Sequence, residues 1–324
     1  MRATPSGVCQ VCGANGSLLH SNLQDRLYGV PGTWNFRRCE NAGCGLVWLD
    51  PKPLECDLHE AYADYFTHGD GPGKADAADG QSSARGIVGG LEQLWLGALL
   101  LRSARRQIEG MFLEGVRPGR VLDVGCGDGR LLAALRSRGW AVEGQDVDRE
   151  AAEHARRKHG ITVHVGELRQ LALPAESFDA VVMNHVIEHA HDPAALVREC
   201  RRLLKPGGLF VATTPNPESF GHAMFGPTWR GLDPPRHLHL LSRMVLAAIA
   251  RAAGFKDWQV WTTPARAGGM LAASLDIKRS GRDQLLGRVR LLHLAAAAWY
   301  QLAARLAHAW RDGSGEEAVL RARK

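Results

Sequence analysis

The sequence predicts an α/β protein with a mostly parallel, doubly wound sheet, preceded by a small cysteine-rich module. Three observations support this. Strand-like apolar segments alternate with helix-like segments between residues 120 and 264, which is typical of a parallel sheet covered on both faces. One helix begins with Asp192 and Pro193 and stops before the glycines of "KPGG", the usual asymmetry of helix ends. Four of the 7 cysteines lie within the first 44 residues.

Composition places the chain among ordinary globular proteins. Its 324 residues suffice for a main domain with an accessory module, and 45% hydrophobic and 23% charged residues are common values. The net charge of +6 permits contact with nucleic acid or an anionic membrane, although a solvated surface is the simpler explanation. No segment resembles a signal peptide or reaches the roughly 18 apolar residues of a membrane span, so we expect a cytoplasmic protein with reduced cysteines.

Residues 1–55 are predicted to form a zinc-ribbon-like module. Its cysteines come in two pairs, each followed by glycine: Cys9 and Cys12, then Cys39 and Cys44. Thiolates at such spacing can approach one ion to about 2.3 Å, and binding of a structural Zn²⁺ would supply roughly 10 kcal/mol that so small a module lacks. The alternative is four unrelated thiols. Residues 56–90, rich in glycine and small polar residues, are expected to be a linker.

The main domain is expected to begin with an amphipathic helix at 91–112 and to continue through residue 265. Its predicted strands are 120–125, 141–147, 161–166, 178–187, 209–215 and 258–264, and its predicted helices are 130–139, 148–160, 192–204 and 242–255. Ligands of such sheets bind beyond the carboxyl ends of the strands.

The loop after the first strand, "VLDVGCGDG" at residues 121–129, combines glycines with acids. A dinucleotide-binding loop has a third glycine where this chain has Arg130, and Asp123 and Asp128 would repel a phosphate. The glycines still let a ligand approach the backbone closely. We therefore expect a cationic ligand without phosphate, and S-adenosylmethionine, with its ammonium, sulfonium and free ribose hydroxyls, matches this description.

Two further acids follow the next strands. Asp146 ends the second strand, where a carboxylate can accept hydrogen bonds from both ribose hydroxyls. Glu167 follows the third strand and is placed to meet the adenine edge. With Asp123, these acids are expected to form one set along the carboxyl edge of the sheet.

Five motifs, "VLDVGCGDG", "GQDVD", "LPAESFDAVVMNHVIEH", "LLKPGG" and "TTPN", resemble in order and spacing those of the class I S-adenosylmethionine-dependent methyltransferases, in particular the ubiquinone-biosynthesis O-methyltransferases. The resemblance covers about residues 105–265. It implies a Rossmann-like sheet of seven strands in which residues 315–324 supply a last, antiparallel strand beside the fifth. The domain would then comprise 91–265 and 315–324, with 266–314 as a helical insertion. The cysteine pairs with "CGLVWLDPKP" resemble the zinc-ribbon module that precedes such domains in bacterial proteins.

The resemblance also implies roles for individual residues. The methionine part of the cofactor would contact Asp123, Gly125 and Gly127, in a loop that also holds Cys126, Asp128 and Gly129. The ribose and adenine would contact Asp146, Val147, Glu167 and Leu168, and Asn184 would form the pocket floor. Glu167 replaces the aspartate that is more usual at its position, and its longer side chain is expected to reach the adenine.

A methyl acceptor with a hydroxyl group calls for a base whose pKa lies near neutrality, which suits histidine. "NHVIEHAHD" places His185 and His189 after the fourth strand, and "DPPRHLHLLS" places Arg236, His237 and His239 in the loop after the fifth. We expect His189 and His237 to be catalytic. For each histidine the alternative is a helix cap or a hydrogen-bonded packing role.

Within the insertion, apolar residues recur every three or four positions, as expected for one face of a helix: Leu285, Val289, Leu292, Ala296, Trp299, Leu302, Leu306 and Trp310. Arginines flank this face. A helix of this kind over 285–311 could lie on a membrane or shelter a lipid-linked acceptor. The alternative is packing against the domain or a second subunit.

Together these features predict an enzyme that methylates a small-molecule, sugar or lipid-linked acceptor, with oxygen favoured as the methylated atom. The alternatives are an RNA methyltransferase that binds RNA through the ribbon, and a non-catalytic S-adenosylmethionine-binding interaction protein. Nucleic acid is disfavoured because the sequence has no concentrated basic stripe laced with aromatic residues. In addition, "NHVI" stands where adenine-methylating enzymes have "NPPY".

Overall fold

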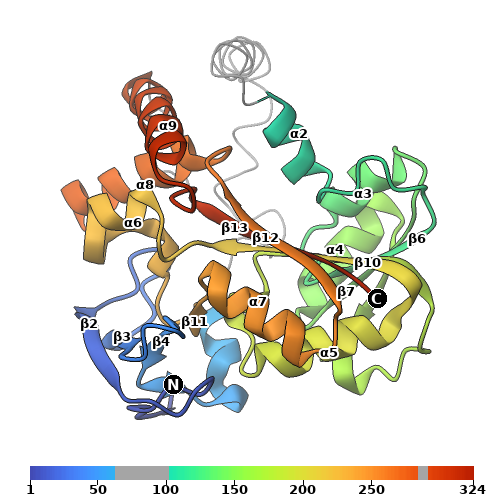
Figure 1. The fold of residues 1–324 in the computed structure, drawn as a ribbon, viewed down its shortest axis with the longest axis horizontal. Coiled ribbons are helices and arrows are strands. Elements are labelled where there is room, and N and C mark those ends of the chain that lie inside the picture. The colour runs from blue at the N-terminus through green and yellow to red at the C-terminus, as the bar shows by residue number, and fades with distance from the viewer. Residues whose placement is uncertain (63–101, 284–290) are drawn as a thin grey trace.

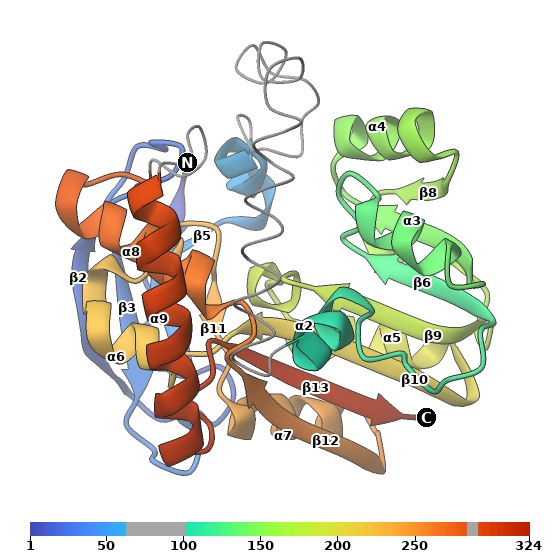
Figure 2. The same cartoon turned by 90° about the horizontal axis from the view of Figure 1, so that it is seen from above.

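The computed structural model describes residues 1–62, 102–283 and 291–324. These residues form a large and a small sheet, each covered by helices (Figure 1 and Figure 2). A two-stranded ribbon of β1 (Ala3–Thr4) and β5 (Lys52–Pro53) lies at the N-terminus.

The large sheet has 7 strands in the order β12-β13-β10-β9-β6-β7-β8. Their bounds are β6 (Arg120–Val124), β7 (Ala141–Asp146), β8 (Thr162–Val165), β9 (Phe178–Asn184), β10 (Leu204–Pro215), β12 (Asp257–Thr263) and β13 (Glu317–Arg323). Neighbouring strands are parallel, except that β13 pairs antiparallel with both β10 and β12. The predicted seven-stranded sheet with an antiparallel last strand is therefore confirmed.

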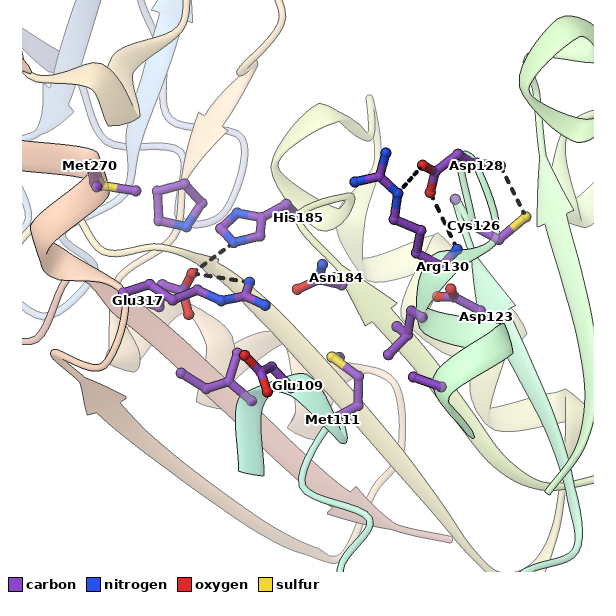
Figure 3. Close-up of a pocket in the computed structure, with 18 of the residues that line it drawn as sticks. Glu109, Met111, Asp123, Cys126, Asp128, Arg130, Asn184, His185, Met270 and Glu317 are labelled. Atoms are coloured by element: carbon purple, nitrogen blue, oxygen red, sulfur yellow. Dashed lines mark hydrogen bonds and ion pairs between the residues drawn. The ribbon is translucent and has the colours of Figure 1, made fainter. Parts of the chain in front are cut away.

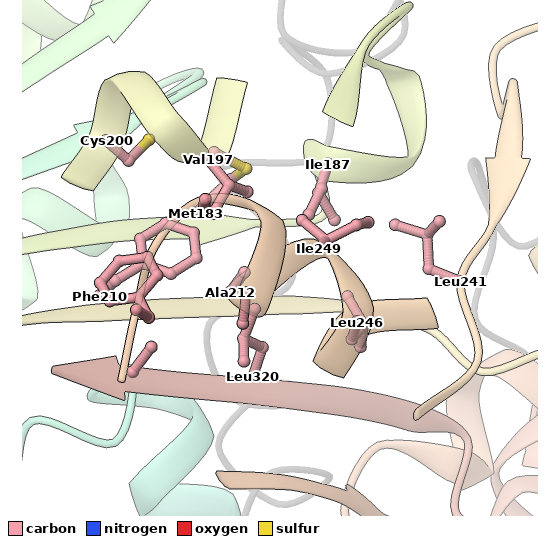
Figure 4. Close-up of a cluster of buried hydrophobic side chains, with 14 of the residues drawn as sticks. Met183, Ile187, Val197, Cys200, Phe210, Ala212, Leu241, Leu246, Ile249 and Leu320 are labelled. Carbon is pink, nitrogen blue, oxygen red and sulfur yellow. The ribbon is translucent and has the colours of Figure 1, made fainter. Parts of the chain in front are cut away.

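Helices bury both faces of this sheet. One face carries α5 (Pro193–Leu203) and α7 (Arg243–Ala252), and the other carries α2 (Arg102–Glu109) and α3 (Arg130–Arg136), while α4 (Arg149–His159) packs beside β7 and β8. Because side chains alternate along a strand, Leu122 enters the core under α5 and α7, and Val121 enters the opposite one. Figure 4 shows the first core, which contains Val197 of α5, Ile249 of α7 and the sheet residue Phe210.

The ends of α4 and α5 follow from their capping residues. The carboxylate of Asp148 accepts from the amides of Glu150 and Ala151, and that of Asp192 accepts from Ala195. As predicted, α5 ends just before the "KPGG" motif: the helix stops at Leu203, and the motif lies in the irregular first part of β10. Short 3-10 helices are η1 (Glu55–Tyr62), η3 (Leu168–Gln170), η4 (Ile187–His189), η5 (Gly226–Thr228) and η6 (Arg230–Leu232).

The small sheet joins the N-terminal module (residues 1–62) to the main domain. Its order is β11-β4-β3-β2, with β2 (Gly16–Leu23), β3 (Trp34–Cys39) and β4 (Val47–Asp50) from the module. The fourth strand, β11 (His239–Leu240), comes from the acceptor loop (residues 230–241) and pairs antiparallel with β4. Residues 55–62 of the module form η1, whereas the rest of the predicted linker and residues 91–101 of the predicted helix lie outside the described residues.

The insertion contributes α8 (Ala267–Ser280) and α9 (Leu291–Trp310), which pack with α6 (Phe220–Phe225) against the small sheet. Their shared core contains Trp34 and Phe36 of the module, Leu271 of α8 and Ala304 of α9. The insertion and the N-terminal module therefore shield each other's apolar side chains from solvent. Within the described ranges, every helix is too short or too polar to cross a membrane.

Candidate functional site

A cavity of about 990 Å³ opens at the carboxyl ends of β6, β9 and β10 (Figure 3). The glycine loop forms one side, and η4, the acceptor loop and the start of α8 form the other. The cavity thus connects the predicted cofactor loop with the predicted acceptor histidines. The predicted site residues that line it are Asp123, Gly125, Cys126, Gly127, Asp128, Asn184, His189 and His237.

The glycine loop depends on left-handed backbone. Gly125, Gly127 and Gly129 have φ angles of 71°, 52° and 76°, a region that glycine enters without steric cost. A side chain at Gly125 would also collide with Val186. The loop can therefore turn tightly and leave its backbone open to a ligand.

Asp123 is buried at the end of β6, and its Oδ1 atom accepts no hydrogen bond from the described residues. Burial, and then the charge of Asp146, raise the pKa of the Asp123 carboxyl well above its usual range. A buried acceptor without a donor is unfavourable, so the site is incomplete without a ligand. The ammonium group of S-adenosylmethionine would supply both the donor and the opposite charge.

Asp146, the last residue of β7, holds the glycine loop in place. Its Oδ2 accepts from the Gly127 amide at 2.7 Å, and its Oδ1 accepts from the Asp148 amide at 2.9 Å. Burial raises the pKa of the Asp146 carboxyl in spite of these bonds. Each oxygen keeps a second lone pair, so the carboxylate can still accept from a ribose hydroxyl.

Five predicted cofactor residues lie near the same edge of the sheet but outside the cavity lining: Gly129, Asp146, Val147, Glu167 and Leu168. Val147 is exposed, whereas Leu168 is buried in the core. Glu167 directly precedes η3, and burial, followed by the charge of Glu55, raises the pKa of its carboxyl. Contacts of these residues with ribose and adenine stay predictions.

On the acceptor side, His189 and His237 lie with ring centroids 4.8 Å apart. The Nδ1 atom of His189 is 2.9 Å from the Arg236 carbonyl oxygen and 3.0 Å from the Tyr62 hydroxyl, and the Nδ1 atom of His237 is 2.8 Å from the Gly231 carbonyl oxygen. A carbonyl only accepts, so in the neutral form of each ring Nδ1 has the proton and Nε2 has the lone pair. Burial, and then His189, lower the pKa of His237 to about 4.

Glu188 is the third member of this cluster. Sequence patterns do not predict it, although it directly precedes His189 in the sequence. It is fully buried, and its Oε1 lies 3.3 Å from Nδ1 of His185 and 3.9 Å from Nε2 of His237. Ligand atoms of Glu188, His189 and His237 lie within 4.8 Å of one another. Two imidazoles and a carboxylate of this kind also suit a divalent metal ion.

His185 connects the cluster to β13 and does not act as a neutral base. Its Nε2 lies 3.0 Å from Oε1 of Glu317, which is also buried. Burial opposes the charge, but hydrogen bonds with Glu188 and Glu317 outweigh it and raise the pKa of His185 to about 10. His185 therefore stays protonated near neutral pH between two carboxylates. Sequence patterns do not predict a role for Glu317 either, because no local pattern connects a residue of the last strand with η4.

The N-terminal module forms the outer support of the acceptor loop. The Leu238 amide donates to the Glu188 carbonyl at 2.9 Å, and the Leu238 carbonyl accepts from the Leu49 amide at 3.0 Å. Next to it, His239 contacts the Gln10 side chain at 2.5 Å, between the first two cysteines. Of the loop histidines, His237 lines the cavity and His239 contacts the module.

The four predicted metal ligands, Cys9, Cys12, Cys39 and Cys44, converge with their sulfur atoms within 4.8 Å of one another. The Cys9–Cys44 and Cys12–Cys39 sulfur distances are 3.7 and 3.3 Å, and all four are free thiols. A tetrahedral Zn²⁺ with Zn–S bonds of about 2.3 Å has sulfur atoms about 3.8 Å apart. The arrangement therefore fits a structural zinc ion.

Comparison with known families matches residues 98–260 to the methyltransferase-domain family. A probable S-adenosylmethionine-dependent methyltransferase of Mycolicibacterium smegmatis is 35% identical over 137 residues, which cover 42% of this chain and 51% of the relative. The ubiquinone biosynthesis O-methyltransferase of Cereibacter sphaeroides is 37% identical over 133 residues, covering 39% of this chain and 54% of the relative. The chain thus spans about half the length of these curated relatives.

Among solved structures, a SAM-dependent methyltransferase from Archaeoglobus fulgidus aligns with 70% of this chain and 94% of its own, at 20% identity and a TM-score of 0.46.

Proposed function

Because this chain belongs to the methyltransferase-domain family, within the class I S-adenosylmethionine-dependent methyltransferases, we propose that it transfers a methyl group to a hydroxyl group of a small-molecule, sugar or lipid-linked acceptor. The observation that supports this most is a single cavity with an unpartnered buried carboxylate at one end and two imidazole Nε2 lone pairs at the other. The name of the O-methyltransferase relatives favours oxygen as the acceptor atom.

At the end of the cavity next to the glycine loop, we assign cofactor contacts to residues that still offer a hydrogen-bond acceptor or open backbone to a ligand. Asp123 would pair with the ammonium group, the backbone of Gly125 and Gly127 would lie against the methionine part, and Asp146 would accept from the ribose hydroxyls. When bound, S-adenosylmethionine supplies an activated methyl group on a sulfonium. The contribution of the protein is to orient that group toward the acceptor side of the cavity.

At the acceptor end, His189 would remove the hydroxyl proton through Nε2. Hydrogen bonds from Nδ1 to the Arg236 carbonyl and with Tyr62 hold its ring and fix its tautomer. His237, neutral near pH 7, would accept a hydrogen bond from the acceptor and orient it. The buried carboxylate of Glu188 would stabilise the imidazolium formed on His189, because opposite charges attract strongly where water is excluded.

We also propose that the four cysteines bind Zn²⁺, whose role would be structural. Cys9, Cys39 and Cys44 are buried in the same core as the α7 residues Val245 and Leu246. The metal would therefore fix the module against the acceptor loop. This burial favours a structural role in a small-molecule enzyme over an RNA-binding ribbon.

The test is methyl transfer from radiolabelled S-adenosylmethionine into lipid-linked glycans and quinone precursors extracted from cells that express the protein. We expect His189→Gln to lower kcat at least a hundredfold, the usual contribution of a general base, with cofactor affinity by calorimetry unchanged. Full activity of this variant would contradict the assignment of the base. Activity that requires added Mg²⁺ or Mn²⁺ would instead assign Glu188, His189 and His237 to a metal ion. Label in RNA alone would support the alternative substrate class.

A further inference from the structure

The outer face of α9 is apolar although it faces solvent. Trp299, Leu306 and Trp310 are 66%, 56% and 93% exposed, and they lie on one side of the helix at spacings of 7 and 4 residues. Single exposed apolar residues are common, but two tryptophans and a leucine on one helix face are not. The predicted apolar face of the insertion is thus turned outward along these residues.

This face cannot turn inward, because the opposite side of α9 is already packed. Ala304 is fully buried, and Gln301 accepts from the Gly268 amide at 3.0 Å and donates to the Pro264 carbonyl at 2.5 Å. Tyr300 stacks edge-on against Phe225 of α6, with ring centroids 5.6 Å apart. The helix α9 is therefore fixed alongside α8 and α6 (Figure 2), and its two tryptophans stay exposed.

Positive charge lies at both ends of this face. Lys278, Arg279 and Arg282 are exposed at the carboxyl end of α8, which leads toward the start of α9, and Arg305 and Arg311 lie at the other end of α9. These five cations form no ion pair within the described ranges.

The nearby acids do not offset this charge. Asp283 pairs with Arg230 at 2.9 Å, and Asp312 pairs with Arg243 at 2.8 Å. Asp276, the acid within α8, is buried. In the part of the chain that the structure describes, the face is therefore an apolar strip between two basic ends.

From this arrangement we propose that the outer face of α9 docks in the plane of an anionic lipid membrane. The tryptophans and Leu306 would enter the boundary between headgroups and acyl chains, and the basic residues at both ends would meet lipid phosphates. A second copy of the chain fits less well. In either a parallel or an antiparallel pairing of two such faces, basic ends would meet basic ends.

The proposal is independent of the methyl acceptor, although the same insertion lines the cavity. Arg266, the residue before α8, and Gly269 and Met270 in its first half line the acceptor side, while α9 packs on α8. Membrane docking would therefore hold the enzyme at the surface where a lipid-linked acceptor resides. Failure of docking would leave cofactor binding and methyl transfer in solution intact, so the two proposals can fail separately.

The test is flotation of the full chain with vesicles of phosphatidylcholine alone or mixed with anionic phosphatidylglycerol. We expect binding to the anionic vesicles that weakens as salt is added. Arg279→Gln with Arg282→Gln should weaken it about 30-fold, since each basic residue near an anionic surface contributes roughly a fivefold factor. The double variant Trp299→Ser, Trp310→Ser should weaken it at least tenfold.

The matched control is Leu18→Ser, which removes a side chain that is 56% exposed, like Leu306, but lies on β2 of the module. It should bind vesicles like the unchanged protein, and cofactor affinity by calorimetry should be the same in every variant. Equal binding by the tryptophan variant and the control would overturn the proposal. So would a dimer in sedimentation velocity that the tryptophan substitutions dissociate, because the face would then belong to a second copy.

Discussion

Asp25 of the N-terminal module and Arg236 of the acceptor loop form a bidentate ion pair in the protein interior. Nη2 of Arg236 lies 2.7 Å from Oδ1 of Asp25, and Nη1 lies 2.9 Å from Oδ2. Asp233 adds a second contact at 2.6 Å, and neither side chain of the main pair is exposed. The guanidinium lowers the pKa of the Asp25 carboxyl against the effect of burial. The module thus neutralises a cation that lies directly before His237.

Asp25→Asn should therefore destabilise the protein strongly. The substitution leaves Arg236 buried with one carboxylate in place of two, and losing a hydrogen bond to a buried charged group costs about 1–3 kcal/mol. Chemical denaturation at neutral pH measures the free energy of unfolding. Asp312→Asn is the control, because its partner Arg243 forms an exposed pair that contributes little. Similar losses in the two variants would show that the buried pair has no special role.

Asp123→Asn should lower the affinity for S-adenosylmethionine by about ten- to a hundredfold, the range expected for one lost charge-assisted hydrogen bond. Burial raises the pKa of the Asp123 carboxyl, and a cationic ligand beside it should lower that pKa again, so binding should release protons at pH values near the raised pKa. Calorimetry in buffers of different ionisation enthalpy detects that release, which the variant should lose. Asp179→Asn is the control, because Asp179 pairs with Lys205 outside the cavity lining. It should change neither the affinity for S-adenosylmethionine nor the proton release.

Loss of zinc should increase the mobility of the acceptor loop and leave the glycine loop unchanged. We expect Cys12→Ser to lower zinc content measured by mass spectrometry and to speed amide hydrogen exchange at Leu49 and Leu238 at least tenfold, since these amides join the module, the loop and η4. The Gly127 amide, bonded to Asp146, should exchange as before. Cys56→Ser, an exposed thiol outside the cluster, is the control. Normal zinc content in Cys12→Ser would refute the assigned ligand set.

Acid should weaken the contact between β2 and α6. His20 and His222 face each other with Nε2 atoms 2.8 Å apart, and Nδ1 of His222 donates to the Pro217 carbonyl, so His222 accepts from His20. Burial, and then the charges of His222 and Arg38, lower the pKa of His20 to about 4, and burial lowers that of His222. The unfolded chain therefore takes up protons first, and stability should fall as the pH drops from about 6.5 toward 4.

His20→Gln keeps a donor for His222 but does not titrate, so its free energy of unfolding should depend less steeply on pH over that interval. Equilibrium denaturation at a series of pH values measures the slope, and His59→Gln, which removes an exposed histidine, is the control. An unchanged slope in His20→Gln would contradict the lowered pKa, because it would mean that the folded protein takes up a proton at His20 as readily as the unfolded chain does. His237, also buried and neutral, should contribute to the remaining slope in both variants.

Local patterns were sufficient for the parallel part of the large sheet, and the family resemblance supplied its antiparallel last strand. The alternation of apolar strands and capped helices encodes the order of elements. Asp123 is the second-last residue of β6 and Asp146 the last of β7, so a parallel sheet brings both acids to one edge. The cysteine pairs were equally readable, because metal ligands recur at short fixed spacings. For these features the information lies within a few residues of each site.

The arrangement of residues on the acceptor side of the cavity depends on tertiary contacts that the sequence patterns do not reveal. Glu317 and Asp25 contribute to it from the last strand and the N-terminal module, and their contacts with His185 and Arg236 join residues far apart in the chain. Glu188 lies only three residues from His185, but its burial beside His237 depends on the fold. The outward direction of the α9 tryptophans was likewise undetermined, since periodicity identifies an apolar face but not the partner it meets. Through local spacing, the sequence by itself determined the parallel part of the sheet, the position of Asp123 and Asp146 near its carboxyl edge, and the cysteine cluster. The tertiary structure decided how module, insertion and last strand close around the acceptor, because those contacts depend on long-range packing and on buried charges that must find partners.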